Sequence, residues 1–403
     1  MTTKILLAAT VGWPSAARYA GGFVAAGCDV DALSPVHAPV RASRYAQRHF
    51  DYAPLFPLAS LRTAITQSNP DMVVACDDRV VMQLLQLHQR ESRKNSHVAR
   101  LIEFSLGNPA AYALVMSRQG SLDAMRAEGV RVPDSVAIAN EEALDIALAQ
   151  IGLPAVIKAD GSWGGEGVAV VRSCEEARSA FRKLAYPPRR WRSLARMVRR
   201  KDAHFLHEAI SPKVRTISMQ AFIEGHPAAS AFAAKNGGVV ASIAYDVLLA
   251  QGTIGPPNVI RRVDCPQIHE AARKVARRFG LSGMHGLDFI RDRNGDVHLI
   301  EINPRATQGG TLAFGTGSDL PAALAAALSP ANTGIRPAIG NDVVAFFPRA
   351  FQGGGGGDWL PRAHHDIPWD DPAVLRALIK LPVGANDNDL RALVYSAMAE
   401  SLA

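Results

Sequence analysis

The chain has 403 residues, enough for two or three domains, and 48% of them are hydrophobic, which excludes an intrinsically disordered protein. The formal net charge of +7 favours an anionic partner such as a nucleotide or a nucleic acid. The four cysteines form no CxxC pair and no run of about 20 apolar residues occurs, so no zinc site, disulfide framework or membrane span is predicted, and the expected location is the cytoplasm.

The first 115 residues alternate strand and helix patterns. "KILLAA" predicts a first strand, "PSAARYAGGFVAAGCDV" a helix, and "DALS" and "DMVVAC" two further strands, an order typical of βαβ units and a parallel sheet. The turn "TVGWPS" has one glycine, so the dinucleotide-binding GxGxxG fingerprint is missing. Asp77 and Asp78 close the last strand, where open α/β sheets place ligand contacts, although Asp78 fits a helix N-cap equally well.

A helix is predicted over residues 118–129, "RQGSLDAMRAEG", and a glycine-rich element follows it. Residues 154–173, "PAVIKADGSWGGEGVAVVRS", predict a strand, a loop and a second strand. The loop glycines can bring backbone amides close to a ligand, and Lys158 supplies a point charge for phosphate. The element is not a P-loop, because GK[ST] does not open a helix here. By itself it fits an ordinary loop as well as a phosphate lid.

Residues 178–202 are rich in arginine. As a nucleic-acid patch this run needs aromatic or base-reading side chains, and it offers only Tyr186 and Trp191. A solvated insertion is therefore the favoured interpretation.

A β-hairpin is predicted over residues 286–305, "GLDFIRDRNGDVHLIEINPR". Asn294-Gly295 favours a two-residue loop, because both positions tolerate positive φ. Counting the antiparallel register outward from that loop sets Asp288 directly opposite Glu301.

The two opposed carboxylates predict a metal site. Directly opposed like charges destabilise a sheet, whereas hard divalent cations bind oxygen clusters of this kind. Asn303 shares a face with Glu301, because residues two apart in a strand do, and Gly286 opposite it leaves space. A solvated hairpin is the alternative, and the many apolar residues of both strands argue against it.

The lid "KADGSWGGEGV", the strand "MQAFIEG" and the terminal pair "GLDFI" and "HLIEINPR", in this order, resemble the ATP-grasp superfamily of carboxylate-amine ligases, with a glutathione synthetase-like ATP-binding fold. The resemblance covers roughly residues 1–325. It implies an α/β and α+β chain in four parts: a Rossmann-like pre-ATP-grasp domain at 1–115, a glycine-lid subdomain at 116–215, a larger antiparallel-sheet subdomain with the magnesium site at 216–330, and a C-terminal extension at 331–403.

The resemblance also implies how ATP would be held. Lys158 would contact the α and β phosphates. The terminal phosphates would meet the lid backbone, which comprises Gly161, Ser162, Trp163, Gly164, Gly165 and Gly167. The strand along adenine would be Gln220, Ala221, Phe222 and Ile223, with Glu224 near the ribose.

Metal and phosphoryl contacts follow from the same resemblance. Asp288 and Glu301 would hold one Mg²⁺ ion, and Glu301 and Asn303 a second, with Mn²⁺ as the alternative metal. Arg305 would steady the transferred phosphoryl group or the acyl phosphate. Arg118 stands where the family usually has its first lysine, so a planar fork replaces a point charge there.

The implied reaction is that ATP phosphorylates a small carboxylate, such as an amino acid, and an amine then displaces phosphate to give an amide. Arg261 and Arg262 are candidates for holding the acceptor carboxylate. His285 is interpreted as a core or rim histidine rather than as a catalytic base. A homodimer is a family-level expectation; no nucleic-acid or membrane partner is expected. The alternatives are another ATP-grasp outcome, carboxylation or phosphoryl transfer, and a nucleic-acid-binding protein that uses residues 189–201.

Overall fold

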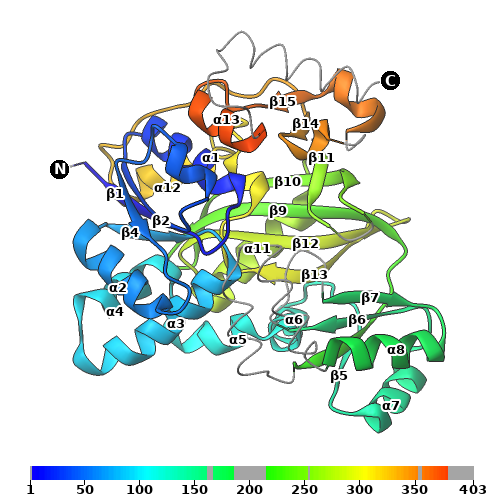
Figure 1. Cartoon of the computed structure of the whole chain (residues 1–403). Helices are drawn as coiled ribbons and strands as arrows, with labels where there is room; N and C mark the ends of the chain where they lie inside the picture. Colours follow the sequence, from blue (N-terminus) through cyan, green and yellow to red (C-terminus); the bar gives the residue numbers. More distant parts are fainter. Residues whose placement is uncertain (1, 161–166, 186–214, 253–254, 353–355, 380–403) are drawn as a thin grey trace.

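The computed structural model describes residues 2–160, 167–185, 215–252, 255–352 and 356–379. Within these ranges the strands form three sheets. Figure 1 shows the amino-terminal sheet at the left, a large sheet beside it and a small sheet below the large one. None of the described helices combines the length and the apolar character that crossing a membrane requires.

The amino-terminal sheet is parallel throughout and has the order β3-β2-β1-β4. Its central strands are buried on both faces, as expected when helices cover a parallel sheet. The predicted βαβ pattern is confirmed, and β3, the short polar "RHFD", adds an edge that was not predicted. The elements are β1 (Lys4–Ala8), α1 (Pro14–Ala25), β2 (Asp29–Ser34), η1 (Pro39–Ala42), β3 (Arg48–Asp51), α2 (Pro57–Ser68), β4 (Met72–Ala75), α3 (Asp78–Glu91), η2 (Ser92–Lys94) and α4 (His97–Leu106).

The small sheet is antiparallel, in the order β5-β8-β6-β7, and packs against α7 and α8. The two predicted strands are confirmed as an antiparallel pair, with Lys158 opposite Val168, and most of the loop between them lies outside the described residues. A connecting segment leads into this unit through η3 (Pro109–Ala111), α5 (Tyr112–Met116) and the predicted helix, α6 (Arg118–Ala127). The unit itself comprises β5 (Ser135–Ile138), α7 (Glu141–Ile151), β6 (Ala155–Ala159), β7 (Val168–Val171), α8 (Cys174–Ala185) and β8 (Ile217–Ala221).

The large sheet has seven strands in the order β13-β12-β9-β10-β11-β14-β15. Alternate residues of β9 face opposite sides: Phe232 joins the core under α11, and Ala231 joins the core under α1 and α12. The residues after 331 extend this sheet through β14 and β15. The elements are β9 (Gly225–Lys235), β10 (Gly238–Ala250), β11 (Pro257–Arg262), α11 (Pro266–Phe279), β12 (Gly283–Asp292), β13 (Val297–Asn303), η4 (Gln308–Thr311), α12 (Leu320–Leu328), β14 (Val343–Phe346), η5 (Arg349–Phe351), η6 (Gly357–Arg362), β15 (His364–Asp366) and α13 (Pro372–Ile379).

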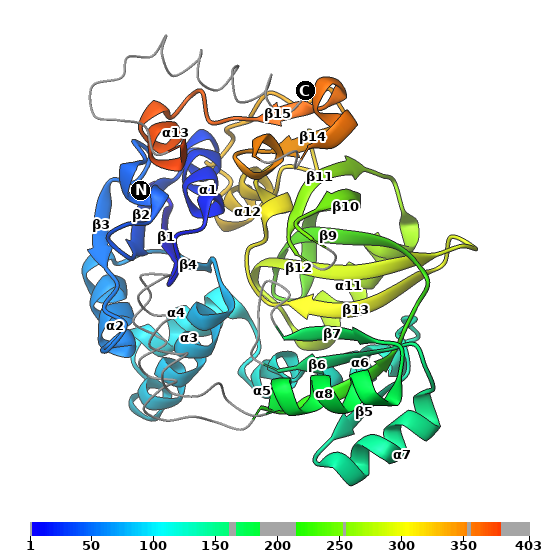
Figure 2. The ribbon, with the colours of Figure 1, turned by 45° about the vertical axis from the view of Figure 1, so that its right-hand side comes forward.

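The three sheets meet where β13 ends. Figure 2 shows the small sheet below the β13 edge of the large sheet, with α7 and α8 on its outer side. The backbone N of Ala306, just after β13, donates a 2.9 Å bond to the carbonyl of Ala75 at the end of β4. The residues predicted for the site therefore approach one another from separate sheets.

Candidate active site

The hairpin of β12 and β13 brings the two predicted carboxylates face to face. Asp288 pairs with Glu301 and Gly286 with Asn303, as the sequence predicts. Gly286 is needed there, because a Cβ on it would lie 2.4 Å from Cγ2 of Thr307.

The predicted loop of this hairpin is wrong by one residue. The backbone N of Asp292 bonds the carbonyl of Asp296 at 2.9 Å, so the loop spans 293–295, and Gly295 has φ +84°. The carboxylate of Asp292 accepts bonds from the loop backbone, which favours this longer turn. The register near the loop is therefore shifted by one, and a β-bulge at Ile300 shifts it back before Asp288 is reached. The pairing survives because the two irregularities cancel.

The same bulge connects the small sheet to the carboxylates. The carbonyl of Ile300, the bulged residue, accepts a 3.2 Å hydrogen bond from Nζ of Lys158 on β6. The Lys158 side chain is buried, and burial lowers its pKa to about 8, against the opposing charge of Glu301. It is therefore still protonated at neutral pH, in surroundings where a positive charge acts strongly on a bound anion.

Asp288, Glu301 and Asn303 fit a hard divalent cation. Burial first, and then the charge of Glu301, raise the pKa of Asp288 to about 6. Asn303 Nδ2 donates a 2.9 Å hydrogen bond to Asp288. Nowhere in the described ranges do three His, Cys, Asp or Glu residues form a metal-holding group. The candidate set is thus the two carboxylates, and a cation between them would relieve the repulsion that raises the Asp288 pKa. The amide oxygen of Asn303 would join this set only after the side chain turns, because it accepts from Arg305 here while the amide nitrogen faces Asp288.

Arg118 reaches the carboxylate of Glu301 from the start of α6. Its Nη2 lies 2.5 Å from Oε1 of Glu301, and its Nη1 donates a 2.9 Å bond to the carbonyl of Ala159 on β6. The guanidinium thus bridges the small sheet and the hairpin through two N–H donor groups, whereas a lysine would offer a single point charge. A metal ion bound at Glu301 would share that carboxylate with Arg118.

Arg305 joins the hairpin to the amino-terminal sheet. Its Nε lies 2.9 Å from Oδ2 of Asp78, and its Nη2 donates a 3.1 Å bond to Oδ1 of Asn303. The N-cap of α3 is Asp77, which accepts from the backbone N of Val80, so the alternative that gave this role to Asp78 is wrong. Because Asp77 supplies the cap, the side chain of Asp78 is available to hold Arg305.

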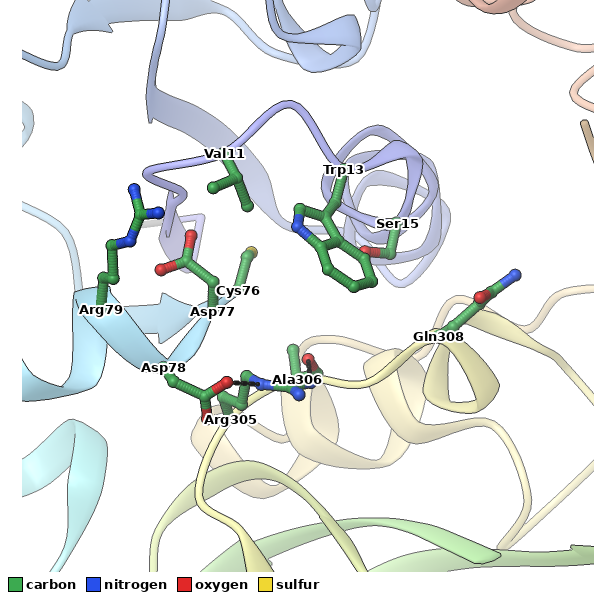
Figure 3. A pocket seen from close by; sticks show the side chains of 10 residues that line it. All are labelled: Val11, Trp13, Ser15, Cys76, Asp77, Asp78, Arg79, Arg305, Ala306 and Gln308. Carbon is green, nitrogen blue, oxygen red and sulfur yellow. Dashed lines mark hydrogen bonds and ion pairs between the residues drawn. The ribbon is translucent and has the colours of Figure 1, made fainter. Parts of the chain in front are cut away.

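A cavity that is open to solvent lies beside this pair (Figure 3). Its walls come from the turn after β1, the end of β4 and the segment after β13, and include Val11, Trp13, Cys76, Asp78, Arg305 and Gln308. Figure 3 shows the Trp13 ring projecting into the space above Ala306. The sequence analysis missed Trp13 and Gln308. One signal could have identified Trp13. Its turn follows the carboxyl end of β1, and Asp77 follows the carboxyl end of β4 at the same edge of the parallel sheet.

The structure describes only some of the other residues that were predicted to contact the nucleotide. Of the predicted lid residues it describes Gly167, whereas Gly161, Ser162, Trp163, Gly164 and Gly165 lie outside the described residues. In the predicted adenine strand, Gln220 is buried in β8 with Ala221 after it, and Phe222 and Ile223 follow the strand end. Glu224 is exposed and forms an ion pair with Arg293 at the hairpin tip.

The other predicted arginines have internal partners. On α8, Arg178 pairs with Asp145 and Arg182 with Glu141 of α7, and the arginine-rich run from 186 onward lies outside the described residues. Arg262 pairs with Asp342 at 2.8 Å, and Arg261 lies 5.0 Å from the ring of Trp359. Neither Arg261 nor Arg262 lines the cavity beside Arg305.

His285 is a core residue, as interpreted from the sequence. It is 2% exposed, its Nε2 lies 2.8 Å from the carbonyl of Ser282, and its Nδ1 has no hydrogen-bond partner within the described chain. Because a carbonyl only accepts, Nε2 carries the proton. Burial lowers the pKa of His285 to about 4.

We expect His285 to make the protein acid-sensitive. The folded state resists protonation until about pH 4, whereas the unfolded chain binds a proton near the ordinary value of 6.5. Stability is therefore retained above pH 6.5 and is lost as the pH falls toward 4, by about 3 kcal/mol at most from this group. Thermal unfolding between pH 7 and 4 should show this loss in wild type and in His226→Gln, an exposed control, and a smaller loss in His285→Gln. Equal pH dependence in all three proteins would contradict the assignment.

Comparison with known proteins supports the fold. The sequence model of the ATP-grasp domain matches residues 193–309, and that of the carbamoyl-phosphate synthase L chain ATP-binding domain matches residues 117–187. No curated protein sequence matches the chain.

Among solved structures the chain resembles biotin carboxylase of Campylobacter jejuni, with 17% identity, TM-score 0.57, and 84% of this chain covering 72% of that one. It also resembles the biotin carboxylase domain of Hydrogenobacter thermophilus 2-oxoglutarate carboxylase, solved with MgADP and bicarbonate. The identity is 15% and the TM-score 0.57, and the match covers 81% of this chain and 70% of that one. A third similar structure is the ATP complex of carboxyaminoimidazole ribonucleotide synthase from Aspergillus clavatus. The identity is 14% and the TM-score 0.59, and the match covers 83% of this chain and 80% of that one. The matched models and the shared fold show that the chain contains a segment similar to the ATP-grasp domain and that it has the fold of these structures.

Proposed function

We propose that the protein is an ATP-dependent ligase that activates a small carboxylate as an acyl phosphate and couples it to an amine. The observation that supports this most directly is the convergence of Lys158, Arg118 and Arg305 on the facing carboxylates of Asp288 and Glu301. Cations and metal ligands gathered at one place are what phosphoryl transfer requires, because negative oxygens must be brought together and neutralised.

In the proposed reaction a carboxylate oxygen attacks the γ-phosphorus of ATP, the bond from that phosphorus to the bridging oxygen breaks, and ADP leaves. The amine nitrogen then attacks the acyl carbon, phosphate departs and the nitrogen loses a proton. Lys158 binds the phosphates, and Arg305 stabilises the charge on the transferred group. Magnesium held by Asp288 and Glu301, with a second ion on Glu301 and Asn303, would neutralise phosphate oxygens.

The adenine strand, the lid backbone, the cytoplasmic location and a homodimer remain predictions. Carboxylation is the second candidate function, because the resembling structures named above include carboxylases, one of them solved with bicarbonate. If bicarbonate takes the place of the organic carboxylate, the same cations and metal ligands would serve.

An ADP-release screen over pairs of carboxylates and amines, with magnesium and with or without bicarbonate, tests the proposal. We expect release to require an organic carboxylate and an amine together, and the product mass to equal their sum less water. Release that requires bicarbonate, with a product heavier by one carboxyl group, would favour carboxylation instead.

A further inference from the structure

Arg349, at the start of η5, is a partly buried cation with no carboxylate partner in the described part of the chain. Its Nη1 donates a 3.3 Å hydrogen bond to Oε1 of Gln308, a neutral group, and its guanidinium lies 5.4 Å from the ring centroid of Trp13. Burial lowers the pKa of Arg349. A partly buried guanidinium is stabilised by an anion that pairs with it, and its planar fork matches a carboxylate.

Arg349 lines a second cavity, next to the one beside Arg305. The two cavities share Trp13, Ser15 and Gln308. The other cation of the second cavity, Arg18, is already paired with Asp366. The charge of Arg349 is thus the one that remains uncompensated in the second cavity.

The start of α1 adds a second favourable interaction for an anion. Trp13, Pro14 and Ser15 line the second cavity, and the helix has no side-chain cap and no acidic residue in its first turn. The positive end of the helix dipole therefore lies at the cavity that contains Arg349.

We infer that the carboxylate substrate carries a second carboxylate, and that Arg349 binds it. The inference rests on the proposed function. The reacting carboxylate would lie near Arg305, the body of the molecule would pass over the face of Trp13, and the second carboxylate would meet Arg349. The two neighbouring cavities share Trp13 and Gln308, so one molecule placed across them would meet both arginines. The substrate class is therefore a compact dicarboxylic acid, a narrower class than any carboxylate.

Matched acids test this, because each pair differs in the second carboxylate. The acids would be titrated calorimetrically into wild type, Arg349→Met and Arg273→Met, with magnesium and ADP present. The pairs are succinate and butyrate, glutarate and pentanoate, and phthalate and benzoate. Arg273 is an exposed control on α11 that pairs with Glu270. For at least one pair we expect wild type and Arg273→Met to bind the diacid at least tenfold more tightly than the matched monoacid. Arg349→Met should lose this preference, and Arg349→Lys should recover part of it.

Three results would overturn the inference: no diacid bound by wild type, no preference in wild type, or a preference that Arg349→Met keeps. The proposed function fails separately, if Glu301→Gln turns over ATP at the wild-type rate. If Arg349→Met keeps the preference and Glu301→Gln loses turnover, the second-carboxylate site is excluded and the ligase proposal stands. Melting temperatures of the Arg349 variants within a few degrees of wild type would exclude a merely structural effect.

Discussion

Glu301→Gln should lower magnesium-dependent ATP turnover by about 10²–10³-fold, the size of loss seen when one charge-stabilising group is removed from an active site. The exchange keeps the shape of the side chain and removes its charge. Glu301 faces Asp288 across the ladder and lies 2.5 Å from Arg118. The variant would therefore weaken the proposed metal site and leave the guanidinium of Arg118 without its carboxylate.

The magnesium concentration at half-maximal turnover separates this effect from misfolding. We expect it to rise in Glu301→Gln and to stay unchanged in Glu270→Gln, whose carboxylate is on the exposed face of α11. Turnover in Glu301→Gln within a few-fold of wild type, with unchanged magnesium dependence, would refute the role of Glu301.

Lys158→Met should have opposite effects on nucleotide binding and on stability. The buried ammonium costs folding energy, because burial lowers its pKa from 10.5 to about 8. Below pH 8 Lys158 is charged in both states, and the charge is less favourable in the folded protein than in the unfolded chain, so it lowers the free energy of unfolding. Above about pH 10.5 the side chain is neutral in both states and this destabilisation vanishes. Replacement by an apolar side chain of similar length should thus raise the free energy of unfolding at pH 7 by about 1–3 kcal/mol.

The affinity for ATP should fall in the same variant by about 10–100-fold, since a charge-assisted hydrogen bond to phosphate is lost. Urea unfolding and a nucleotide titration measure the two effects. Lys183→Met, on the exposed face of α8, is the matched control and should change neither. A variant that loses both stability and ATP affinity would indicate that Lys158 has a structural role instead.

The hairpin and the lid strands could be predicted because their signals are local. The alternation of β12 and β13 and the turn signal between them lie close together in the sequence, so the hairpin itself was predicted. The pairing of Asp288 with Glu301 was predicted as well, but from a two-residue loop that the structure does not have. The bulge at Ile300 could not be predicted. It depends on the longer turn at Asp292 and on Lys158, which arrives from a different sheet.

The partners of the predicted residues required tertiary structure. Asp78 was noticed as the end of a strand, but its ion pair with Arg305 joins positions 227 residues apart. Arg118 was placed by resemblance, and its contact with Glu301 depends on how α6 packs against β13.

The sequence by itself determined the parallel first sheet, the two strands that flank the glycine-rich loop and the hairpin that contains Asp288 and Glu301, because strand period and turn chemistry are properties of neighbouring residues. The final register of that hairpin also depends on the bulge at Ile300. Only the tertiary structure brought Trp13, Gln308 and Arg349 to one connected cavity. These residues come from the first turn, the segment after β13 and the start of η5, and no periodicity or motif links them. A cavity is formed by the packing of elements that are distant in the chain, so its shape and charge appear only after the sheets have come together.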